Sequence, residues 1–156
     1  MNTTDPYDSK DVADNILEEW DDIVLSLDFK HLLAFGTCLG FYRDGGYIEG
    51  DNDIDVWIKP DNLKLIMPKM LERGYTLGRK AHSQHFFKNN ILLDVWLIPK
   101  AYHEPYDIIE YNSRKYNAPN QVENYLEVLY GDWKTPSNKD ANWRDLGKLE
   151  NKCINQ

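Results

Sequence analysis

The chain has 156 residues, enough for one domain with a single hydrophobic core, and its apolar fraction of 42% and aromatic fraction of 13% exclude a disordered segment. The formal net charge of −8 argues against duplex nucleic acid as the main partner, because a phosphate backbone requires a basic surface. No stretch is apolar over the length of a membrane span, the first residues lack a leader pattern and the two cysteines make no disulfide framework, so we expect a soluble, cytoplasmic protein.

The beginning of the chain predicts a helix, a strand and a second helix. Apolar residues recur at helical spacing over residues 9–27, between acidic ones. Residues 31–35 form a short apolar run that Gly36 would stop, which is typical of a buried strand. Residues 37–43 then suit a short helix, closed by the Asp-Gly-Gly sequence at residues 44–46.

The middle of the chain continues to alternate between strand and helix patterns. Residues 53–58 predict a second strand. Residues 62–73 have the apolar spacing of a helix in spite of Pro68. Residues 75–80 and 83–88 are two further candidate strands.

The last third of the chain predicts one more strand and one more helix. Asn89-Asn90 is a suitable pair for a tight turn. It leads into residues 91–98, the most apolar strand candidate. Residues 99–119 are rich in Tyr, Pro and Asn and predict a loop, and residues 121–130 predict a helix.

This order of elements predicts an α/β (α+β) domain with a mixed β-sheet flanked by helices. We expect residues 1–136 to form that single domain, including the N-terminal helix. The polar residues 137–156 are expected to be a poorly packed C-terminal tail.

Residues 51–55 read Asp-Asn-Asp-Ile-Asp and carry the strongest functional signal of the chain. Side chains two apart on a strand share a face, so Asp51, Asp53 and Asp55 would line up while Ile54 turns to the other face. Adjacent carboxylates repel one another unless a cation lies between them. Oxygen-only ligands suit Mg²⁺, which typically takes one or two carboxylates together with substrate phosphates. The run therefore predicts metal-assisted phosphoryl or nucleotidyl transfer.

This acidic run has two alternative interpretations. An EF-hand calcium loop requires Gly at its sixth position and Glu at its twelfth, where this chain has Val56 and Asn62. A solvated acidic turn is the second, in a chain with 26 acidic residues. The run continues directly into an apolar strand that would carry Asp55 into the fold, where a carboxylate needs a partner. The metal site is favoured, with Asp51, at the entrance of the strand, as its most solvated carboxylate.

Asp94 is the second informative residue, because every other residue of the segment 91–98 is apolar. Burying an unpaired carboxylate is costly, so Asp94 either bonds to a loop or helix end or lies beside Asp53 and Asp55. In the second arrangement the three carboxylates hold two metal ions about 3.5–4 Å apart. Asp94 would then bind metal or take the proton from the acceptor hydroxyl.

Gly36 and Thr37 follow a predicted strand and precede a short helix. Backbone N–H groups and a hydroxyl at such a position can bind phosphate. Arg43 lies further along the same helix, and its guanidinium suits bidentate phosphate contact. The alternative for Arg43 is a surface ion pair with Asp44 or Glu49. We treat Gly36, Thr37 and Arg43 as the candidate nucleotide- and phosphate-binding residues.

The order of strand, Gly-Thr turn, short helix, Asp-x-Asp strand and later aspartate resembles the nucleotidyltransferase fold. Within that fold the sequence is similar to the LicD/fukutin-type phosphotransferases. Residues 92–99 resemble the strand that carries this family's third aspartate, and residues 125–136 resemble its closing helix and Tyr-Gly-Asp motif. The earlier motifs, G-T-x-L-G-x-x-R and I-x-x-D-x-D-I-D, are matched by Gly36, Thr37, Leu39, Gly40, Arg43, Ile48, Asp51, Asp53, Ile54 and Asp55.

The resemblance implies transfer of a phosphorylated alditol, phosphocholine or a similar group from a CDP-activated donor to a glycan hydroxyl. It implies Mg²⁺ or Mn²⁺ as the cofactor, with Asp53, Asp55 and Asp94 as the catalytic and metal-binding residues. Two alternatives stay open. One is transfer of a nucleoside monophosphate from an NTP to a small hydroxyl compound, as antibiotic nucleotidyltransferases of this fold do. The other is a catalytically idle nucleotide-binding module.

Further candidates are histidines and aromatic residues outside these motifs. His82 and His85 either face the site across the sheet or are neutral imidazoles at a strand edge. The aromatic residues around 102–116 and Trp133 either stack on a base or sugar or pack over the core.

Overall fold

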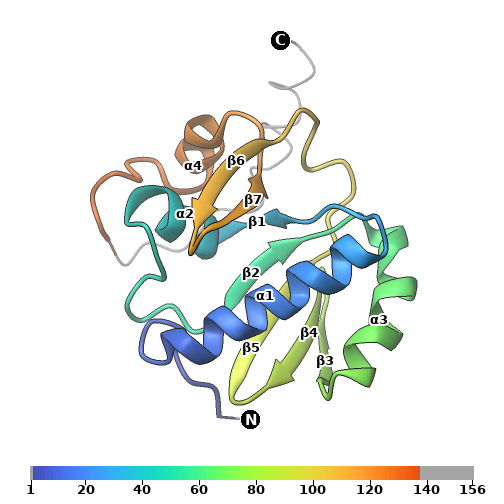
Figure 1. The fold of residues 1–156 in the computed structure, drawn as a ribbon. Coiled ribbons are helices and arrows are strands. Elements are labelled where there is room, and N and C mark those ends of the chain that lie inside the picture. Colours follow the sequence, from blue (N-terminus) through green and yellow to red (C-terminus); the bar gives the residue numbers. More distant parts are fainter. Residues whose placement is uncertain (1, 138–156) are drawn as a thin grey trace.

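A five-stranded mixed sheet lies at the centre of the molecule, whose computed structural model describes residues 2–137 (Figure 1). The strands stand in the order β1-β2-β5-β4-β3. Strands β2 and β5 are parallel, and every other neighbouring pair is antiparallel. The predicted fold class is therefore confirmed. The bounds are β1 (Leu32–Leu33), β2 (Ile54–Trp57), β3 (Thr76–Lys80), β4 (Ser83–Lys88) and β5 (Ile91–Trp96).

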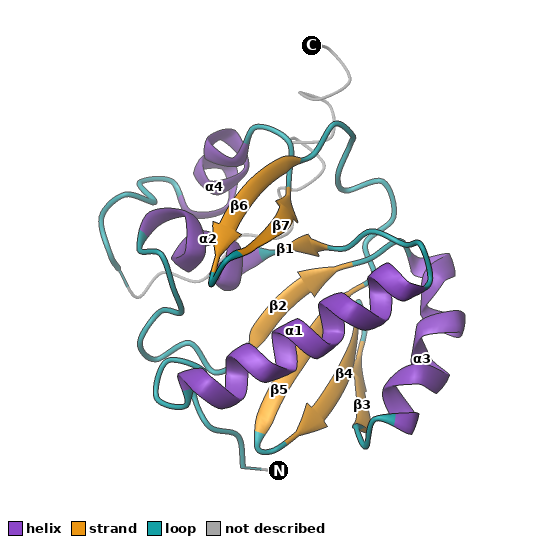
Figure 2. Cartoon of the chain, in the orientation of Figure 1, coloured by secondary structure: helices purple, strands orange, loops and turns teal. Residues whose placement is uncertain are grey.

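Helices flank this sheet, and the longest of them crosses one of its faces (Figure 2). Helix α1 packs on β5 and on α3. Trp20 of α1 is fully buried, and its ring lies 6.4 Å from that of Phe86 in β4. The helices are α1 (Lys10–Ser26), α2 (Phe35–Arg43), α3 (Leu63–Glu72) and α4 (Val122–Tyr130), with a short 3-10 turn at Pro60–Asn62.

Alternation along the strands gives the sheet two chemically different faces. The face toward α1 is apolar, because Ile54, Phe86 and Leu93 are fully buried there and occupy neighbouring register positions on β2, β4 and β5. On the opposite face, Asp55 is the register partner of Asp94. The sheet thus separates a hydrophobic core from a row of acidic residues.

Most of the predicted elements are confirmed with small changes at their ends. Pro68 lies inside α3, and Gly74, just beyond that helix, has φ +89°. Asn89 and Asn90 connect β4 to β5 with φ values of +53° and +65°, the left-handed conformation that a two-residue hairpin turn requires.

The strand predicted over residues 31–35 is wrong in its second half. Only Leu32 and Leu33 pair with β2, and Phe35 already begins α2. Gly36 therefore lies in the first turn of a helix and does not end a strand. The chain changes direction at Phe35, whose φ of +45° is unusual for a bulky residue.

The loop predicted over residues 99–119 contains a β-hairpin of its own. Strands β6 (Asp107–Tyr111) and β7 (Arg114–Ala118) are antiparallel, joined by Asn112 and Ser113 in the left-handed region. The hairpin lies beside β1, and α4 follows it (Figure 1). One side of the hairpin is buried, and the other exposes Glu110 and Lys115 beside Ile108, which is why its composition resembles that of a loop.

Two further expectations concern the C-terminal tail and membrane-spanning segments. The predicted polar tail lies outside the described residues, apart from residue 137. None of the helices described between residues 2 and 137 has the length and apolar character that a membrane crossing requires.

Candidate active site

Three carboxylates of the acidic run converge at the start of β2. One oxygen each of Asp51, Asp53 and Asp55 lies within 4.8 Å of the others. Asp55 is buried, and the other two are half-buried. Within residues 2–137, no lysine or arginine forms an ion pair with any of the three. A cluster of carboxylates that the described residues leave without a counter-charge fits a divalent cation with oxygen ligands.

Two glycines on α2 let the acidic loop reach this position. A Cβ atom at Gly36 would collide with the Asp51 carboxylate, and one at Gly40, one turn later, would collide with the carbonyl oxygen of Gly46. Residues 46–51 therefore lie directly against the helix. Asp51 lies half-buried beside Gly36 and is less buried than Asp53 and Asp55, in agreement with its expected place as the most solvated of the three.

Asp55 is fixed by groups from two other elements. Its backbone N–H donates to the Thr37 hydroxyl at 2.8 Å, and its carboxylate accepts from the Trp96 indole N–H at 3.1 Å. The Trp96 ring in turn packs on Phe35, with 4.5 Å between the ring centres. Thr37 is predicted to bind phosphate. In the structure, its hydroxyl accepts the hydrogen bond that connects the start of α2 to β2.

The left-handed conformation of Phe35 is supported from α4. The Phe35 N–H donates to the hydroxyl of Tyr125 at 2.7 Å, and both side chains are buried. Backbone strain of this kind persists only where surrounding contacts enforce it, and it is common at functional sites. The N–H groups of Gly36 and Thr37 follow that of Phe35 in the first turn of α2. N–H groups in the first turn of a helix have no acceptor within the helix.

Asp94 lies on the neighbouring strand, level with Asp55. It is buried, and its Oδ1 atom lies 3.4 Å from Nε2 of His85 on β4. Asp94 does not belong to the tight three-carboxylate cluster, but its charge acts on two members of that cluster. The structure therefore brings Asp53, Asp55 and Asp94 to one side of the sheet, as the sequence predicts.

Burial and mutual repulsion make these carboxyl groups weak acids. Burial raises the pKa of Asp51 to about 6. Burial, with the charges of Asp51 and Asp94, raises the pKa of Asp53 to about 8. Burial, with the charges of Asp53 and Asp94, raises the pKa of Asp55 well above its usual range. The pKa of Asp94 is also raised by burial, in spite of a hydrogen bond with Ser83. A bound cation would reverse this preference for the protonated forms.

Arg43 lies at the other end of α2, about 10 Å along the helix axis from Gly36 at 1.5 Å per residue. Its Nε and Nη2 atoms each donate to an oxygen of Asp44 at 2.8 Å, and its Nη1 donates to the carbonyl of Trp133 at 3.1 Å. This is the ion pair that the sequence offers as the alternative. A contact between Arg43 and a donor phosphate stays a prediction.

Three residues that sequence reasoning did not assign to the site help to build it: Phe35, Trp96 and Tyr125. The position of Trp96 carries a usable signal, because it lies two residues after Asp94 on the same face of β5. The other two depend on the conformation at the start of α2, which no residue pattern indicates. Of the two histidines, His85 is buried on the aspartate face and His82 is exposed in the turn before β4.

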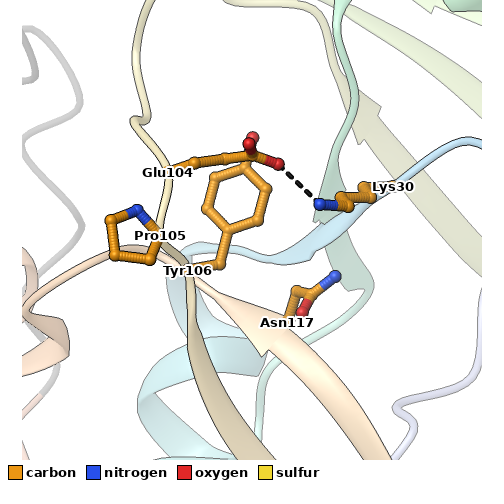
Figure 3. A pocket seen from close by; sticks show the side chains of 5 residues that line it. All are labelled: Lys30, Glu104, Pro105, Tyr106 and Asn117. Carbon is orange, nitrogen blue, oxygen red and sulfur yellow. Dashed lines mark hydrogen bonds and ion pairs between the residues drawn. The ribbon is translucent and has the colours of Figure 1, made fainter.

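A separate cleft of about 500 Å³ lies beside the β6–β7 hairpin, with none of the aspartates in its lining. Figure 3 shows Tyr106 and Pro105 at one side and Lys30 reaching across to Glu104. The ion pair measures 2.7 Å between Nζ and Oε1, but both side chains are exposed, at 61% and 54%. Such a surface pair contributes little to stability, and the cleft gathers no catalytic groups.

No family model and no curated protein matches the chain. Several solved structures match it. The lincosamide antibiotic adenylyltransferase LnuA with lincomycin bound has a TM-score of 0.59 and 15% sequence identity, over 96% of this chain and 98% of that one. ANT(2")-Ia in complex with adenylyl-2"-tobramycin has a TM-score of 0.58 and 10% identity, over 90% of this chain and 88% of that one. A solution structure of the antibiotic-resistance factor ANT(2'')-Ia has a TM-score of 0.59 and 11% identity, over 90% and 83%.

These likenesses show the nucleotidyltransferase-like fold, and they correct the family assignment. The resemblance to LicD/fukutin-type phosphotransferases is wrong, because the structures that share the fold are lincosamide and aminoglycoside nucleotidyltransferases. A resemblance that rests on the Gly-Thr, Asp-x-Asp and third-aspartate motifs is therefore not sufficient to identify the family.

Proposed function

We propose that this protein is a metal-dependent nucleotidyltransferase that moves a nucleoside monophosphate from an NTP to a hydroxyl group of a small compound. The observation that carries the proposal is the cluster of Asp51, Asp53 and Asp55, which no lysine or arginine of residues 2–137 neutralises, with Asp94 level with it on the next strand. The shared fold supports an enzyme of this class. The CDP-linked donor and the glycan acceptor have no support from these comparisons.

Asp53 and Asp55 would hold Mg²⁺ or Mn²⁺, in one or two ions, and Asp51 lies close enough to contribute. Asp94 lies outside this cluster on the next strand, and its charge acts on Asp53 and Asp55. When bound, such an ion neutralises the carboxylates and the donor's phosphate oxygens and so favours displacement at phosphorus. We expect the N–H groups of Gly36 and Thr37, in the first turn of α2, to donate to those phosphate oxygens.

In the proposed reaction the acceptor oxygen forms a bond to the α-phosphorus while the bond from that phosphorus to the bridging oxygen breaks. Pyrophosphate leaves with the bonding electrons. Asp94 is the proposed acceptor of the hydroxyl proton, because it lies level with Asp55 on the neighbouring strand and outside the three-carboxylate cluster. The rings of Trp96 and Phe35 pack together beside Asp55, and we expect this apolar pair to limit the access of water.

A labelling experiment tests the proposal. Each of the four NTPs, labelled at the α-phosphate, is incubated with Mg²⁺ or Mn²⁺ and a panel of lincosamides and aminoglycosides, and products are identified by mass spectrometry. We expect a nucleoside monophosphate adduct with at least one pair. Asp53→Asn should abolish it, and the exposed Asp61→Asn should not. Turnover of a CDP-linked donor instead of any NTP would overturn the proposal, and nucleotide binding without transfer to the panel or to other hydroxyl compounds would favour the idle binding module.

A further inference from the structure

We propose that His85 is a positioning residue for Asp94: it holds one carboxylate oxygen so that the other faces the acceptor hydroxyl. This inference rests on the proposed function, since it assigns a task within that reaction. His85 and Asp94 are register partners on the antiparallel strands β4 and β5, on the face that also carries Asp55. The pair therefore extends the acidic row by one strand.

One buried atom of His85 and one of Asp94 face each other, and neither has a hydrogen-bond partner in the described part of the chain. These atoms are Nε2 of His85 and Oδ1 of Asp94, which lie 3.4 Å apart. The side chains are 9% and 8% exposed. Their separation exceeds the usual N–H···O length of about 2.7–3.2 Å only slightly, so a small rotation of either side chain closes the bond. Buried polar groups that face one another in this way are expected to pair.

The surroundings fix the imidazole ring on the other side. His85 pairs in register with Gly78 on β3, where an added Cβ atom would lie 3.4 Å from Cβ of His85 and 3.0 Å from the Phe87 ring. Phe87 meets the His85 ring edge-on, with 5.9 Å between the ring centres. Ser83, two residues earlier on the same face, also hydrogen-bonds the Asp94 carboxylate. Strand β4 thus restrains Asp94 at two points.

Restraint of this kind acts on the reaction step more than on substrate binding. A carboxylate that accepts a proton must present one lone pair to the hydroxyl in a fixed direction, and a group that holds its other oxygen reduces the conformations to be searched. Loss of such an outer partner typically lowers activity by about 10–100-fold. We therefore expect His85 substitutions to lower kcat while the KM values for both substrates stay nearly constant.

The test compares three substitutions at His85. The amide of His85→Gln reaches the place of Nε2 and can donate to Asp94, whereas the shorter His85→Asn cannot, and His85→Leu removes the donor. We expect the Gln variant to keep kcat within a few-fold of the wild type and the Asn and Leu variants to lose about 10–100-fold, with KM changed less than about two-fold. The matched control is His82→Asn in the same hairpin, which should leave kcat unchanged.

A measurement independent of turnover accompanies the kinetics. In ¹H–¹⁵N spectra of the histidine rings, we expect Nε2 of His85 to carry a proton whose shift changes in Asp94→Asn, while the His82 signals stay in place. Equal kcat in the Gln and Asn variants, whether or not the Leu variant folds, would overturn the positioning role. Wild-type protein that transfers no nucleotide would overturn the proposed function and this inference with it, whereas wild-type transfer with unchanged His85→Asn kinetics would overturn this inference alone.

Discussion

Asp55 shows how much of the site depends on contacts of single residues. Its N–H, its carboxylate and its strand position are each fixed by a different partner: the Thr37 hydroxyl, the Trp96 indole and the parallel strand with Asp94. A carboxylate so restrained has little freedom to relax away from its acidic neighbours. The proposed cation site would therefore already be formed before an ion binds.

The Thr37 hydroxyl should matter for stability as well as for activity. Thr37→Val keeps the shape of the side chain but leaves the buried N–H of Asp55 without an acceptor, which costs about 1–3 kcal/mol of unfolding free energy. Thr37→Ser keeps the acceptor and should stay close to the wild type. Urea denaturation of the two variants checks this difference. If they prove equally stable, the Asp55 N–H finds another acceptor.

Neutralising one carboxylate should separate stability from activity. Asp53→Asn or Asp55→Asn relieves the repulsion that burial intensifies, so we expect the metal-free variants to melt at or above the wild-type temperature. Each change also removes a metal ligand, so nucleotide transfer should fall to a few per cent or less. Thermal unfolding in EDTA and the labelling assay measure the two effects. Substantial transfer by both variants would contradict the metal site.

At the scale of elements, the sequence predicts the strands that contain Asp55 and Asp94 better than it predicts the elements packed around them. Periodicity identifies α1, β2 and β5, because each buries an apolar stripe that a residue pattern records. It does not identify β6 and β7, where alternation is masked by polar residues, nor the start of α2 at Phe35. That start depends on a hydrogen bond that the Phe35 N–H donates to the hydroxyl of Tyr125, ninety residues away, which local patterns do not contain.

The face of α2 that carries Gly36 and Gly40 is the element that places Asp51. Gly40→Ala puts a methyl group against the backbone of residue 46 and 2.9 Å from Cγ1 of Ile48, so the loop must move. We expect a loss of about 1–3 kcal/mol in unfolding free energy and a lower affinity for Mg²⁺. Chemical denaturation and metal titration measure the two effects. Gly46→Ala, whose new methyl group meets nothing within 4 Å, is the control and should be close to neutral.

At the scale of the whole molecule, α1 and the β6–β7 hairpin are joined through buried carboxylates away from the acidic site. Asp14 accepts hydrogen bonds from Tyr47 at 2.9 Å and from Tyr111 at 2.6 Å. Asp21 bonds to His31 at 2.7 Å and to Arg114 at 3.2 Å. These contacts connect helix, acidic loop and hairpin into one body. Carboxylates with hydrogen-bond donors thus connect α1 to the hairpin and the acidic loop, while the carboxylates that crowd one another are gathered at the candidate site.

The difference between aspartates with raised pKa values and acidic residues with lowered pKa values predicts how stability depends on pH. An aspartate whose folded pKa is raised binds its proton more tightly in the folded state, so stability falls as the pH rises from the unfolded value of 3.8 to the folded value. For Asp51 and Asp53 the upper limits are about pH 6 and pH 8, because their pKa values are raised to about 6 and about 8. The partners of Asp21 and Glu19 lower the pKa values of these two residues in spite of burial. Their protonation therefore changes the stability only below their ordinary pKa values of 3.8 and 4.5. They do not oppose the trend above pH 5.

We therefore expect the Tm of the wild type in EDTA to fall between pH 5 and pH 8, and the fall to be smaller in Asp53→Asn. Mg²⁺ should restore most of the loss at pH 8, where the carboxylates are free of protons, and little of it at pH 5, because protons compete with the metal for the same oxygens. Differential scanning calorimetry at the two pH values, with and without Mg²⁺, measures all four states. A Tm in EDTA that rises toward pH 8 would show that the aspartates are not packed together as the structure has them. A Mg²⁺ effect of equal size at both pH values would show that the ion binds elsewhere.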